Sequence, residues 1–291
     1  MEDKDWNRLV RLLRNGHCTP FLGSGACTPT LPTGKALAEE WAAHYRYPFP
    51  PPYELPRVMQ YVAIQEGDTP YVKSLLAARL GRAGPHDFSA PGEPHAFLAD
   101  LNIPVFITTN YDDFLATALR DRGKNPDSRI CQWYENDRAP DDGPNPTVSR
   151  PLVFHLHGRV TEPPSMVLTE SDYLEFLLTV GIDRGEGGQL LPTPVASAIK
   201  TQPLLFIGYS HEDMTYRYLF KGLLRGIPDI HRRKHISVQM MPPVDSTIPE
   251  AEELAKKYLH EYLGSDLKIA IFWGTARDFC IELRKRLSTT A

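Results

Sequence analysis

The chain has 291 residues, of which 42% are hydrophobic and 23% charged, as is typical of a globular protein with a sizeable core. Its net charge of −4 argues against a general nucleic-acid-binding surface, so we expect no sequence-specific contact with DNA or RNA. No signal peptide or membrane-spanning run is visible, and the four cysteines are scattered, so we expect a reducing, cytoplasmic location with no membrane partner.

Apolar runs of strand length alternate with helical patterns along the chain. The expected strands are Thr19–Leu22, Val105–Thr108, Ile130–Tyr134, Leu152–Leu156, Leu204–Ile207, Ile236–Met240 and Ile269–Trp273. The helical patterns are Trp6–Arg14, Asp112–Arg120, Ser171–Val180, Pro194–Lys200, Asp213–Leu224, Pro249–Leu263 and Ala276–Leu287. Several strands are apolar on both faces, as in a parallel sheet that helices cover on both sides. The alternation predicts an α/β fold with a doubly wound, Rossmann-like, mostly parallel sheet.

Residues 34 to about 100 do not follow this alternation, because they contain several helical patterns and no convincing strand. We interpret them as a helical insertion after the first strand, within a single domain that spans residues 1–291. The segment Asp137–Pro151 is rich in proline, aspartate, glycine and asparagine and is expected to be a surface loop.

The first expected strand runs into the turn Gly23-Ser24-Gly25, and a helix is expected to begin near Thr33-Gly34. A strand, a glycine turn and a helix together can present backbone N–H groups to an anion. The full dinucleotide fingerprint needs a third glycine, and Thr28 occupies that position. On these residues alone, phosphate binding and an ordinary turn both remain possible.

Three more polar motifs follow strands, at the edge where open α/β sheets place their ligands. They are TTNYDDF after Val105–Thr108, HLHG after Leu152-Val153-Phe154, and GYSHED after Leu204–Ile207. Each motif also has a simpler interpretation as a helix cap, a turn or a polar strand end.

Taken together, the four motifs resemble the sirtuin-like domains. The matching residues occur in the family's order, as Gly23-Ser24-Gly25-Ala26, Thr108-Thr109-Asn110-Tyr111-Asp112, His157-Gly158 and Gly208-Tyr209-Ser210. The chain lacks the four-cysteine zinc module of sirtuin deacylases, has Thr109 in place of their glutamine, and has no asparagine after Ile236–Met240. In motif it is most similar to the bacterial sirtuin-like NAD hydrolases of antiviral defence.

The resemblance implies that NAD is the substrate and that the bond between nicotinamide and ribose is cleaved. In that assignment Asn110 orients the attacking water and a ribose hydroxyl, and His157, with a pKa near neutral, acts as general base. Asp112 binds the nicotinamide carboxamide, and the backbone of Gly23, Ser24 and Gly25 donates to the phosphates. The other expected NAD-binding residues are Ala26, Thr109, Gly208, Tyr209, Ser210, Gly274 and Thr275, of which the last two equally suit a simple helix cap.

Three other functions remain open at this point. The same NAD site could serve a protein deacylase or an ADP-ribosyltransferase, or a non-catalytic sensor of NAD or ADP-ribose. A metal hydrolase built on His155, His157, His211 and Asp213 is a further alternative. We expect no metal, because no four-ligand set has the spacing of a structural zinc site.

A hydrolase that consumes NAD must be held inactive until it is needed. We therefore expect a homo-oligomer or a complex with a separately encoded defence partner. The family resemblance suggests an ATPase, a nuclease or an Argonaute-like protein as that partner.

Overall fold

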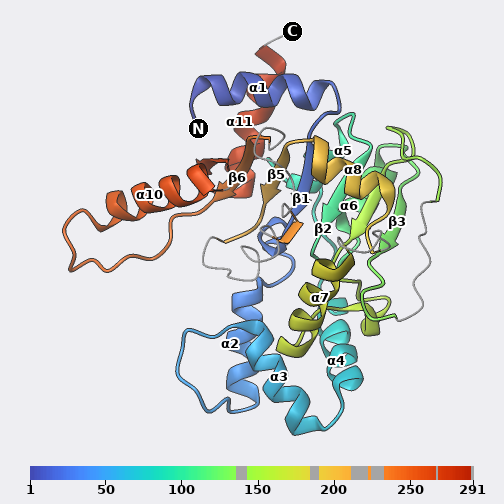
Figure 1. The fold of residues 1–291 in the computed structure, drawn as a ribbon, viewed down its shortest axis with the longest axis vertical. Coiled ribbons are helices and arrows are strands. Elements are labelled where there is room, and N and C mark those ends of the chain that lie inside the picture. Colours follow the sequence, from blue (N-terminus) through green and yellow to red (C-terminus); the bar gives the residue numbers. More distant parts are fainter. Residues whose placement is uncertain (136–142, 184–189, 211–221, 224–232, 267, 290–291) are drawn as a thin grey trace.

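Seven parallel strands form one sheet at the centre of the computed structural model (Figure 1). The strands are β1 (Thr19–Leu22), β2 (Val105–Thr108), β3 (Asp127–Ile130), β4 (Leu152–His155), β5 (Leu204–Ile207), β6 (His235–Gln239) and β7 (Ile269–Trp273). Their order across the sheet is β3-β4-β2-β1-β5-β6-β7. The structure describes residues 1–291 except 136–142, 184–189, 211–221, 224–232, 267 and 290–291.

Helices cover both faces of the sheet. Successive side chains of a strand point to opposite faces, and Phe21 and Leu22 accordingly belong to two different hydrophobic clusters. The cluster around Leu22 includes side chains of four helices: α1 (Asp3–Arg14), α5 (Pro94–Ala99), α6 (Phe114–Asp121) and α11 (Ala276–Thr289). The cluster around Phe21 includes side chains of α7 (Glu170–Asp183), α8 (Thr193–Thr201) and α10 (Ala251–Glu261). This arrangement confirms the doubly wound α/β fold.

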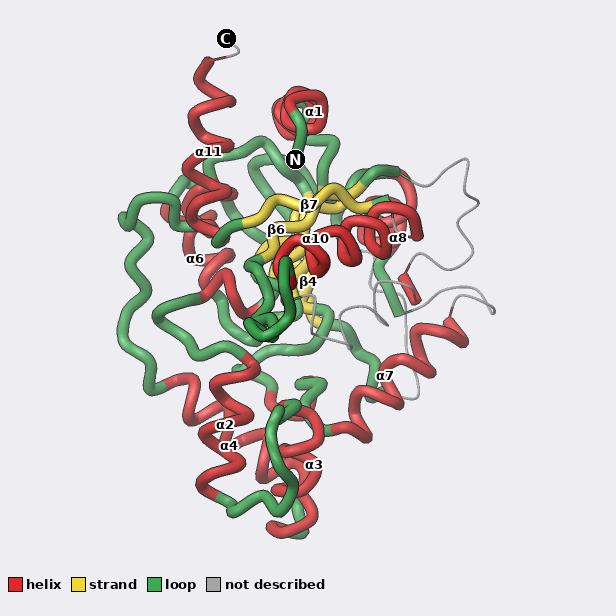
Figure 2. Tube along the Cα trace, turned by 90° about the vertical axis from the view of Figure 1, so that its left-hand side faces the viewer, coloured by secondary structure: helices red, strands yellow, loops and turns green. Residues whose placement is uncertain are grey.

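The helices α2 (Gly34–His44), α3 (Leu55–Glu66) and α4 (Thr69–Gly81) lie between β1 and β2 in the chain, followed by α5. In both views α2, α3 and α4 lie together at one end of the molecule, away from α1 and α11 (Figures 1 and 2). They share a third hydrophobic cluster, which also contains Met166 and Leu168 from the segment before α7. The helical insertion after the first strand is therefore confirmed.

Local sequence signals set the boundaries of these inserted helices. Thr33 caps α2, since its hydroxyl oxygen accepts a hydrogen bond from the Ala36 N–H at 3.3 Å. Asp68 caps α4 by accepting from the Tyr71 N–H at 2.9 Å. Gly67 ends α3 in the left-handed conformation, with φ +68°. The Thr33 cap explains why α2 begins where the sequence predicts it, and the other two residues set the end of α3 and the start of α4.

A buried ion pair joins the inserted helices to the rest of the fold. Lys73 of α4 donates to Asp172 of α7 at 2.9 Å, and its ammonium lies 5.2 Å from the centre of the Trp133 ring. Asp172 also accepts from the N–H groups of Leu168 and Thr169 at 3.0 and 2.9 Å. The pair therefore fixes α4, α7 and the segment between β4 and α7 relative to one another.

Some expected boundaries are wrong. The strand expected at Ile130–Tyr134 is β3 at Asp127–Ile130, because pairing with β4 involves the more polar residues before the apolar run. The helix expected at Asp112–Arg120 begins at Phe114, and the pattern at Pro249–Leu263 is α10 followed by a π-helical turn, η3 (Tyr262–Asp266). The helix expected at Asp213–Leu224 lies outside the described residues, apart from positions 222 and 223.

Among the described helices, none combines the length and the apolar character needed to cross a lipid bilayer.

Candidate active site

The four sequence motifs follow four adjacent strands, β4, β2, β1 and β5, at their carboxyl ends. Without the edge strand β3, the strands numbered in chain order lie in the order 3-2-1-4-5-6, which is that of the dinucleotide-binding α/β fold. The direction in which new strands are added reverses between β1 and β5. Open α/β sheets bind their ligands at such a switch point, so the predicted convergence of the motifs on one edge is present.

The glycine turn after β1 is packed against the turn after β5. The Gly23 N–H donates to the Ile207 carbonyl and the Gly25 N–H to the Gly208 carbonyl, both at 2.9 Å. These two N–H groups are therefore engaged by the protein itself, which corrects the expectation that they donate to a phosphate. Ser24 is exposed and begins the short 3-10 helix η1 (Ser24–Cys27), where an N–H has no helical partner. Ser24 is thus the residue of this turn best placed for an anion.

Close backbone approach explains the glycines in both turns. A Cβ on Gly208 would lie 2.4 Å from both the Ala26 nitrogen and the Gly23 oxygen, and Gly208 has φ +87°. A Cβ on Gly23 would lie 2.8 Å from the Gly208 oxygen. The first and last motifs are therefore complementary halves of one packed turn pair.

Replacing Gly208 with alanine should destabilise the fold by several kcal/mol, because overpacking against backbone adds to the strain of a positive φ. Gly67→Ala is the matched control, since Gly67 has φ +68° and open space around its Cβ direction. We expect it to cost only about 1 kcal/mol, from the backbone conformation alone. Urea unfolding measures both; equal losses would show that the turn pair is loosely packed.

Asn110 follows β2 and lies 7% exposed beneath the glycine turn. Its side-chain amide nitrogen donates to the Gly23 carbonyl at 3.0 Å and to the Cys27 sulfur at 3.1 Å. Because both amide hydrogens are engaged, the side-chain oxygen is the group left to accept from a water or a ribose hydroxyl. The structure thus ties the second motif to the first.

Asp112 lies half-buried beside Asn110, and both of its oxygens have protein partners. One accepts from the Phe114 N–H at 2.9 Å, so Asp112 caps α6. The other accepts from the Cys27 thiol at 3.1 Å. A ligand at this carboxylate would therefore replace the thiol contact rather than meet a free group.

Thr109 and Tyr209 link the second and fourth motifs. Their hydroxyl groups are 2.7 Å apart, and the Tyr209 hydroxyl also donates to the Leu22 carbonyl at 2.8 Å. The two residues thereby join the ends of β2 and β5 across β1. Ser210 beyond them is exposed, while His211 and Asp213 of the metal-hydrolase alternative lie outside the described residues.

Two buried histidines lie at the carboxyl end of β4, and the Nε2 atom of each lacks a hydrogen-bond partner within the described structure. His155 is the last residue of β4, and its Nδ1 lies 3.3 Å from the Asn110 carbonyl oxygen. His157 is 5% exposed, and its ring packs edge-on against Tyr173 and Phe176. The His155 Nε2 lies 3.8 Å from the Asp113 carboxylate, so His157 Nε2 is the nitrogen that favours a ligand-facing role at this strand end.

Burial lowers the pKa of His157 from 6.5 to about 3. Burial and the nearby Arg159 guanidinium lower the pKa of His155 to about 4. The expectation of a near-neutral pKa for His157 is therefore wrong, because the ring lies among aromatic side chains and no charged group of the described residues pairs with it. Both imidazoles are neutral at physiological pH, so each has a nitrogen able to accept a proton.

These lowered pKa values imply a dependence of stability on pH. Between about pH 6.5 and 3, the His157 imidazole is protonated in the unfolded chain but neutral in the folded one. The free energy of unfolding therefore falls as the pH drops through this range. At pH 5 this effect of His157 has lowered the free energy of unfolding by about 2 kcal/mol relative to neutral pH. We expect His157→Phe to lose less stability than the wild type between pH 7.5 and 5 in urea unfolding. Parallel losses in the two proteins would contradict the burial of a neutral imidazole.

Gly274 and Thr275 follow β7, three strands away from β1 in the sheet. The Thr275 hydroxyl donates to the Asp278 carboxylate at 2.6 Å and accepts from the Asp278 N–H at 3.1 Å. This reciprocal pair is a helix cap for α11. The structure therefore supports the cap interpretation and does not bring these two residues together with the other motifs.

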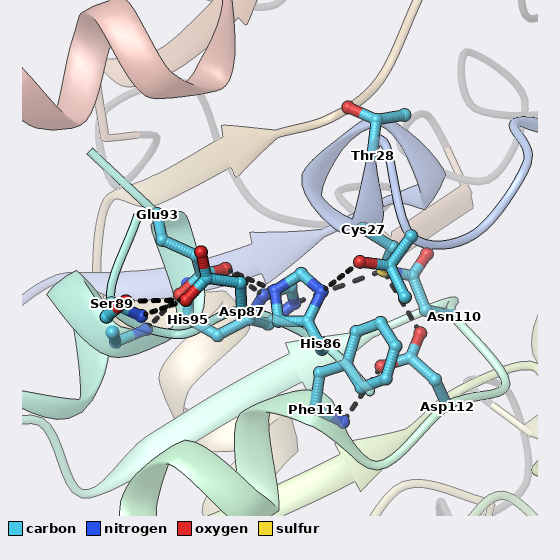
Figure 3. Close-up of polar contacts among 12 residues, drawn as sticks. Cys27, Thr28, His86, Asp87, Ser89, Glu93, His95, Asn110, Asp112 and Phe114 are labelled. Atoms are coloured by element: carbon cyan, nitrogen blue, oxygen red, sulfur yellow. Dashed lines mark hydrogen bonds and ion pairs between the residues drawn. The ribbon is translucent and has the colours of Figure 1, made fainter. Parts of the chain in front are cut away.

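A polar cluster that the sequence analysis missed lies next to Asn110 and Asp112 (Figure 3). The Glu93 carboxylate accepts from His95 Nδ1 at 2.6 Å and lies 2.9 Å from His86 Nε2. Burial raises the pKa of Glu93, but hydrogen bonds from His86 and His95 outweigh it and hold the pKa well below its usual value. No local spacing marks this cluster, because its residues come from α5 and the segment before it and meet Cys27 only in the fold.

The sheet order and the polar groups at its switch point place the chain among the Rossmann-like α/β proteins with a ligand site at the strand ends. A model of the family described as SIR2-like domain matches residues 104–263, and the chain belongs to this family. The match contains Asn110, His157 and Gly208, whereas β1 and its glycine turn precede it.

Three similar proteins are named NAD(+) hydrolase ThsA. The one from Cytobacillus dafuensis is 31% identical over 152 residues, which are 50% of this chain and 27% of that protein. The one from Enterococcus faecium is 28% identical over 121 residues, or 42% of this chain and 22% of that protein. The one from Acinetobacter baumannii (strain 532279) is 23% identical over 133 residues, or 46% of this chain and 24% of that protein. The matched part of this chain thus spans about a quarter of the length of these relatives.

Proposed function

We propose that this chain hydrolyses NAD⁺ to nicotinamide and ADP-ribose. The observation that carries the proposal is the buried His157, whose Nε2 has no hydrogen-bond partner within the described structure, at the edge that also holds Asn110. The names of the three relatives support NAD⁺ as the substrate.

The reaction breaks the bond between the ribose carbon and the nicotinamide nitrogen, so nicotinamide leaves with the bonding electron pair. Positive charge develops on the ribose, as in other glycoside cleavages. The Asn110 side-chain oxygen accepts from the attacking water and aligns it. As the water oxygen bonds to the ribose carbon, its proton becomes strongly acidic and passes to neutral His157. A base with a pKa of about 3 suffices at that stage, and the proton is then released to solvent.

The remaining contacts follow the four strand ends. Ser24, held by Gly23 and Gly25, lies against the pyrophosphate, whereas Ala26 is buried, with its N–H bonded to the Gly23 carbonyl at 3.0 Å, and supports the turn. Asp112 accepts from the nicotinamide carboxamide in place of the Cys27 thiol. Thr109, Gly208, Tyr209 and Ser210 line the ribose and adenosine half.

The test is to incubate the purified chain with NAD⁺ and to measure nicotinamide and ADP-ribose by chromatography. Equal amounts of the two products support hydrolysis. Tight NAD⁺ binding without turnover would instead indicate a sensor, and nicotinamide release that depends on an acyl-lysine peptide would indicate a deacylase. Either result would overturn the proposal.

We further propose that the activity serves bacterial antiviral defence and is gated by assembly, either of this chain with itself or with an ATPase, nuclease or Argonaute-like partner. The reason is the cost to a cell of constant NAD⁺ loss. Light scattering with and without NAD⁺, read beside the turnover rate, tests the gating. A monomer with full, unregulated turnover would contradict it.

A further inference from the structure

Three side chains from three separate segments place potential metal ligands together at the Asp112 end of the site (Figure 3). They are Cys27 at the end of η1, His95 in α5 and Asp112 after β2. The Cys27 sulfur lies 4.0 Å from His95 Nε2 and 3.1 Å from the Asp112 carboxylate, and the three ligand atoms all lie within 4.8 Å of one another. Tetrahedral bonds to Zn²⁺ would hold such atoms about 3.5 Å apart.

The orientation of His95 suits this arrangement. Glu93 accepts the hydrogen bond of His95 Nδ1 at 2.6 Å, so Nε2 is the nitrogen turned toward the sulfur. A carboxylate that holds the far nitrogen of a histidine is the usual outer support of a metal-binding imidazole. Glu93 is itself fixed by His86 at 2.9 Å and by the His95 N–H at 3.0 Å.

From this geometry we propose that Cys27, His95 and Asp112 bind a thiophilic divalent metal ion such as Zn²⁺, with Glu93 as a positioning residue. The neighbouring set His86, Glu93 and His95 is a poorer site, because the Glu93 oxygen already bonds both imidazoles. Three protein ligands fall short of a closed four-ligand structural site, so we expect reversible binding with one position open. The proposal departs from the expectation of no metal, which considered only the four-ligand spacing of a structural zinc site.

Binding replaces the thiol proton by the metal. The Cys27 S–H bond breaks, the proton passes to the buffer, and the thiolate donates to the ion. The Asn110 N–H that already points at the sulfur, at 3.1 Å, remains as a hydrogen-bond donor to the thiolate. The His95 Nε2 and an Asp112 oxygen each donate an electron pair to the ion.

A metal at this position would oppose catalysis. The argument rests on the proposed function, in which Asp112 accepts from the nicotinamide carboxamide. An ion held by Asp112 removes that acceptor and occupies the nicotinamide end. We therefore infer that Zn²⁺ inhibits NAD⁺ hydrolysis reversibly.

The metal site is tested first without reference to activity. Metal-free protein is titrated with Co²⁺, and the thiolate-to-cobalt charge-transfer band is recorded. We expect one equivalent to bind to the wild type. Cys27→Ser keeps a hydroxyl in place of the thiol and should lose the band and bind at least about 10- to 100-fold more weakly. Glu93→Gln should keep the band and weaken binding about 10- to 100-fold.

Cys18→Ser is the matched control, because Cys18 is an equally buried free cysteine in a different part of the fold. It should retain the band. Thermal unfolding shows which variants are folded. Loss of the band in Cys27→Ser counts as evidence only if this variant is folded. No band in the wild type, or an undiminished band in folded Cys27→Ser, would overturn the metal site.

Inhibition is tested second, as the ratio of NAD⁺ turnover with and without Zn²⁺ for each protein. The wild type and Cys18→Ser should be inhibited and recover with a chelator, whereas Cys27→Ser should be insensitive. Equal inhibition of Cys27→Ser would overturn the blocking role. A chain without any NAD⁺ turnover would overturn the proposed function and leave the Co²⁺ result to decide the metal site by itself.

Discussion

Replacing either His157 or Asn110 with alanine is expected to abolish detectable NAD⁺ hydrolysis. Loss of the general base alone lowers rates by about 10² to 10⁴, and loss of water alignment adds to that. NAD⁺ binding should persist, because the glycine turn and the end of β5 remain in place. Nicotinamide release and calorimetric NAD⁺ affinity are the two measurements.

The two variants should differ in stability. Asn110→Ala removes one of two donors to the Gly23 carbonyl, which keeps the Ala26 N–H at 3.0 Å, so we expect a cost of about 1 kcal/mol. His157→Ala leaves a cavity beside Tyr173 and Phe176. His235→Gln is a control for losing a buried histidine, since His235 lies in β6, outside the four motifs. Wild-type turnover in both alanine variants would show that the reaction occurs elsewhere.

Asp172→Ala is expected to destabilise the protein by about 3–5 kcal/mol, the largest effect on stability that we predict. The substitution leaves the Lys73 ammonium, whose side chain is only 7% exposed, without its carboxylate partner. It also removes the acceptor for two backbone N–H groups. Glu253→Ala removes a partner of Lys256 from an exposed ion pair and should cost less than about 1 kcal/mol.

A second variant separates the charge from the packing. With Lys73→Met added to Asp172→Ala, no buried charge is left, so part of the lost stability should return in urea unfolding. The Leu168 and Thr169 N–H groups remain unpaired, which keeps the recovery incomplete. A double variant as unstable as Asp172→Ala would show that the ammonium is not the main cost.

The sequence predicts the central sheet well, because strands such as Leu204–Ile207 are apolar on both faces and are bounded by turn residues. It misplaces the edge strand β3, whose residues Asp127, Ser128 and Arg129 are polar because an edge strand is only half covered. The strand is predicted at the apolar residues just after β3 because they fit a strand pattern. Trp133 in that run is instead buried outside the sheet, where its ring N–H donates to the Ser165 carbonyl at 2.8 Å.

The candidate site is predictable only where its residues directly follow strands. Asn110, His157 and Gly208 belong to short motifs at strand ends, so topology alone brings them to one edge. Glu93 and His95 are far from Cys27 in the chain and lie at the start of a helix, and their contact depends on how α5 packs against η1. Whether a backbone N–H is already engaged, as at Gly23 and Gly25, is equally a property of the packed turns and not of the motif.

The position of β1 at the middle of the sheet has a consequence during synthesis on the ribosome. Phe21 pairs with Ile107 on one side and with Phe206, 185 positions later, on the other. At roughly 5–20 residues per second, β1 waits for its second neighbour for about 10–40 s after it has been translated. During that time its four buried residues, of which Phe21 and Leu22 are large and apolar, have one open hydrogen-bonding edge. The nascent chain must therefore be shielded from aggregation until β5 has been made, and chaperone demand should fall once β5 leaves the exit tunnel.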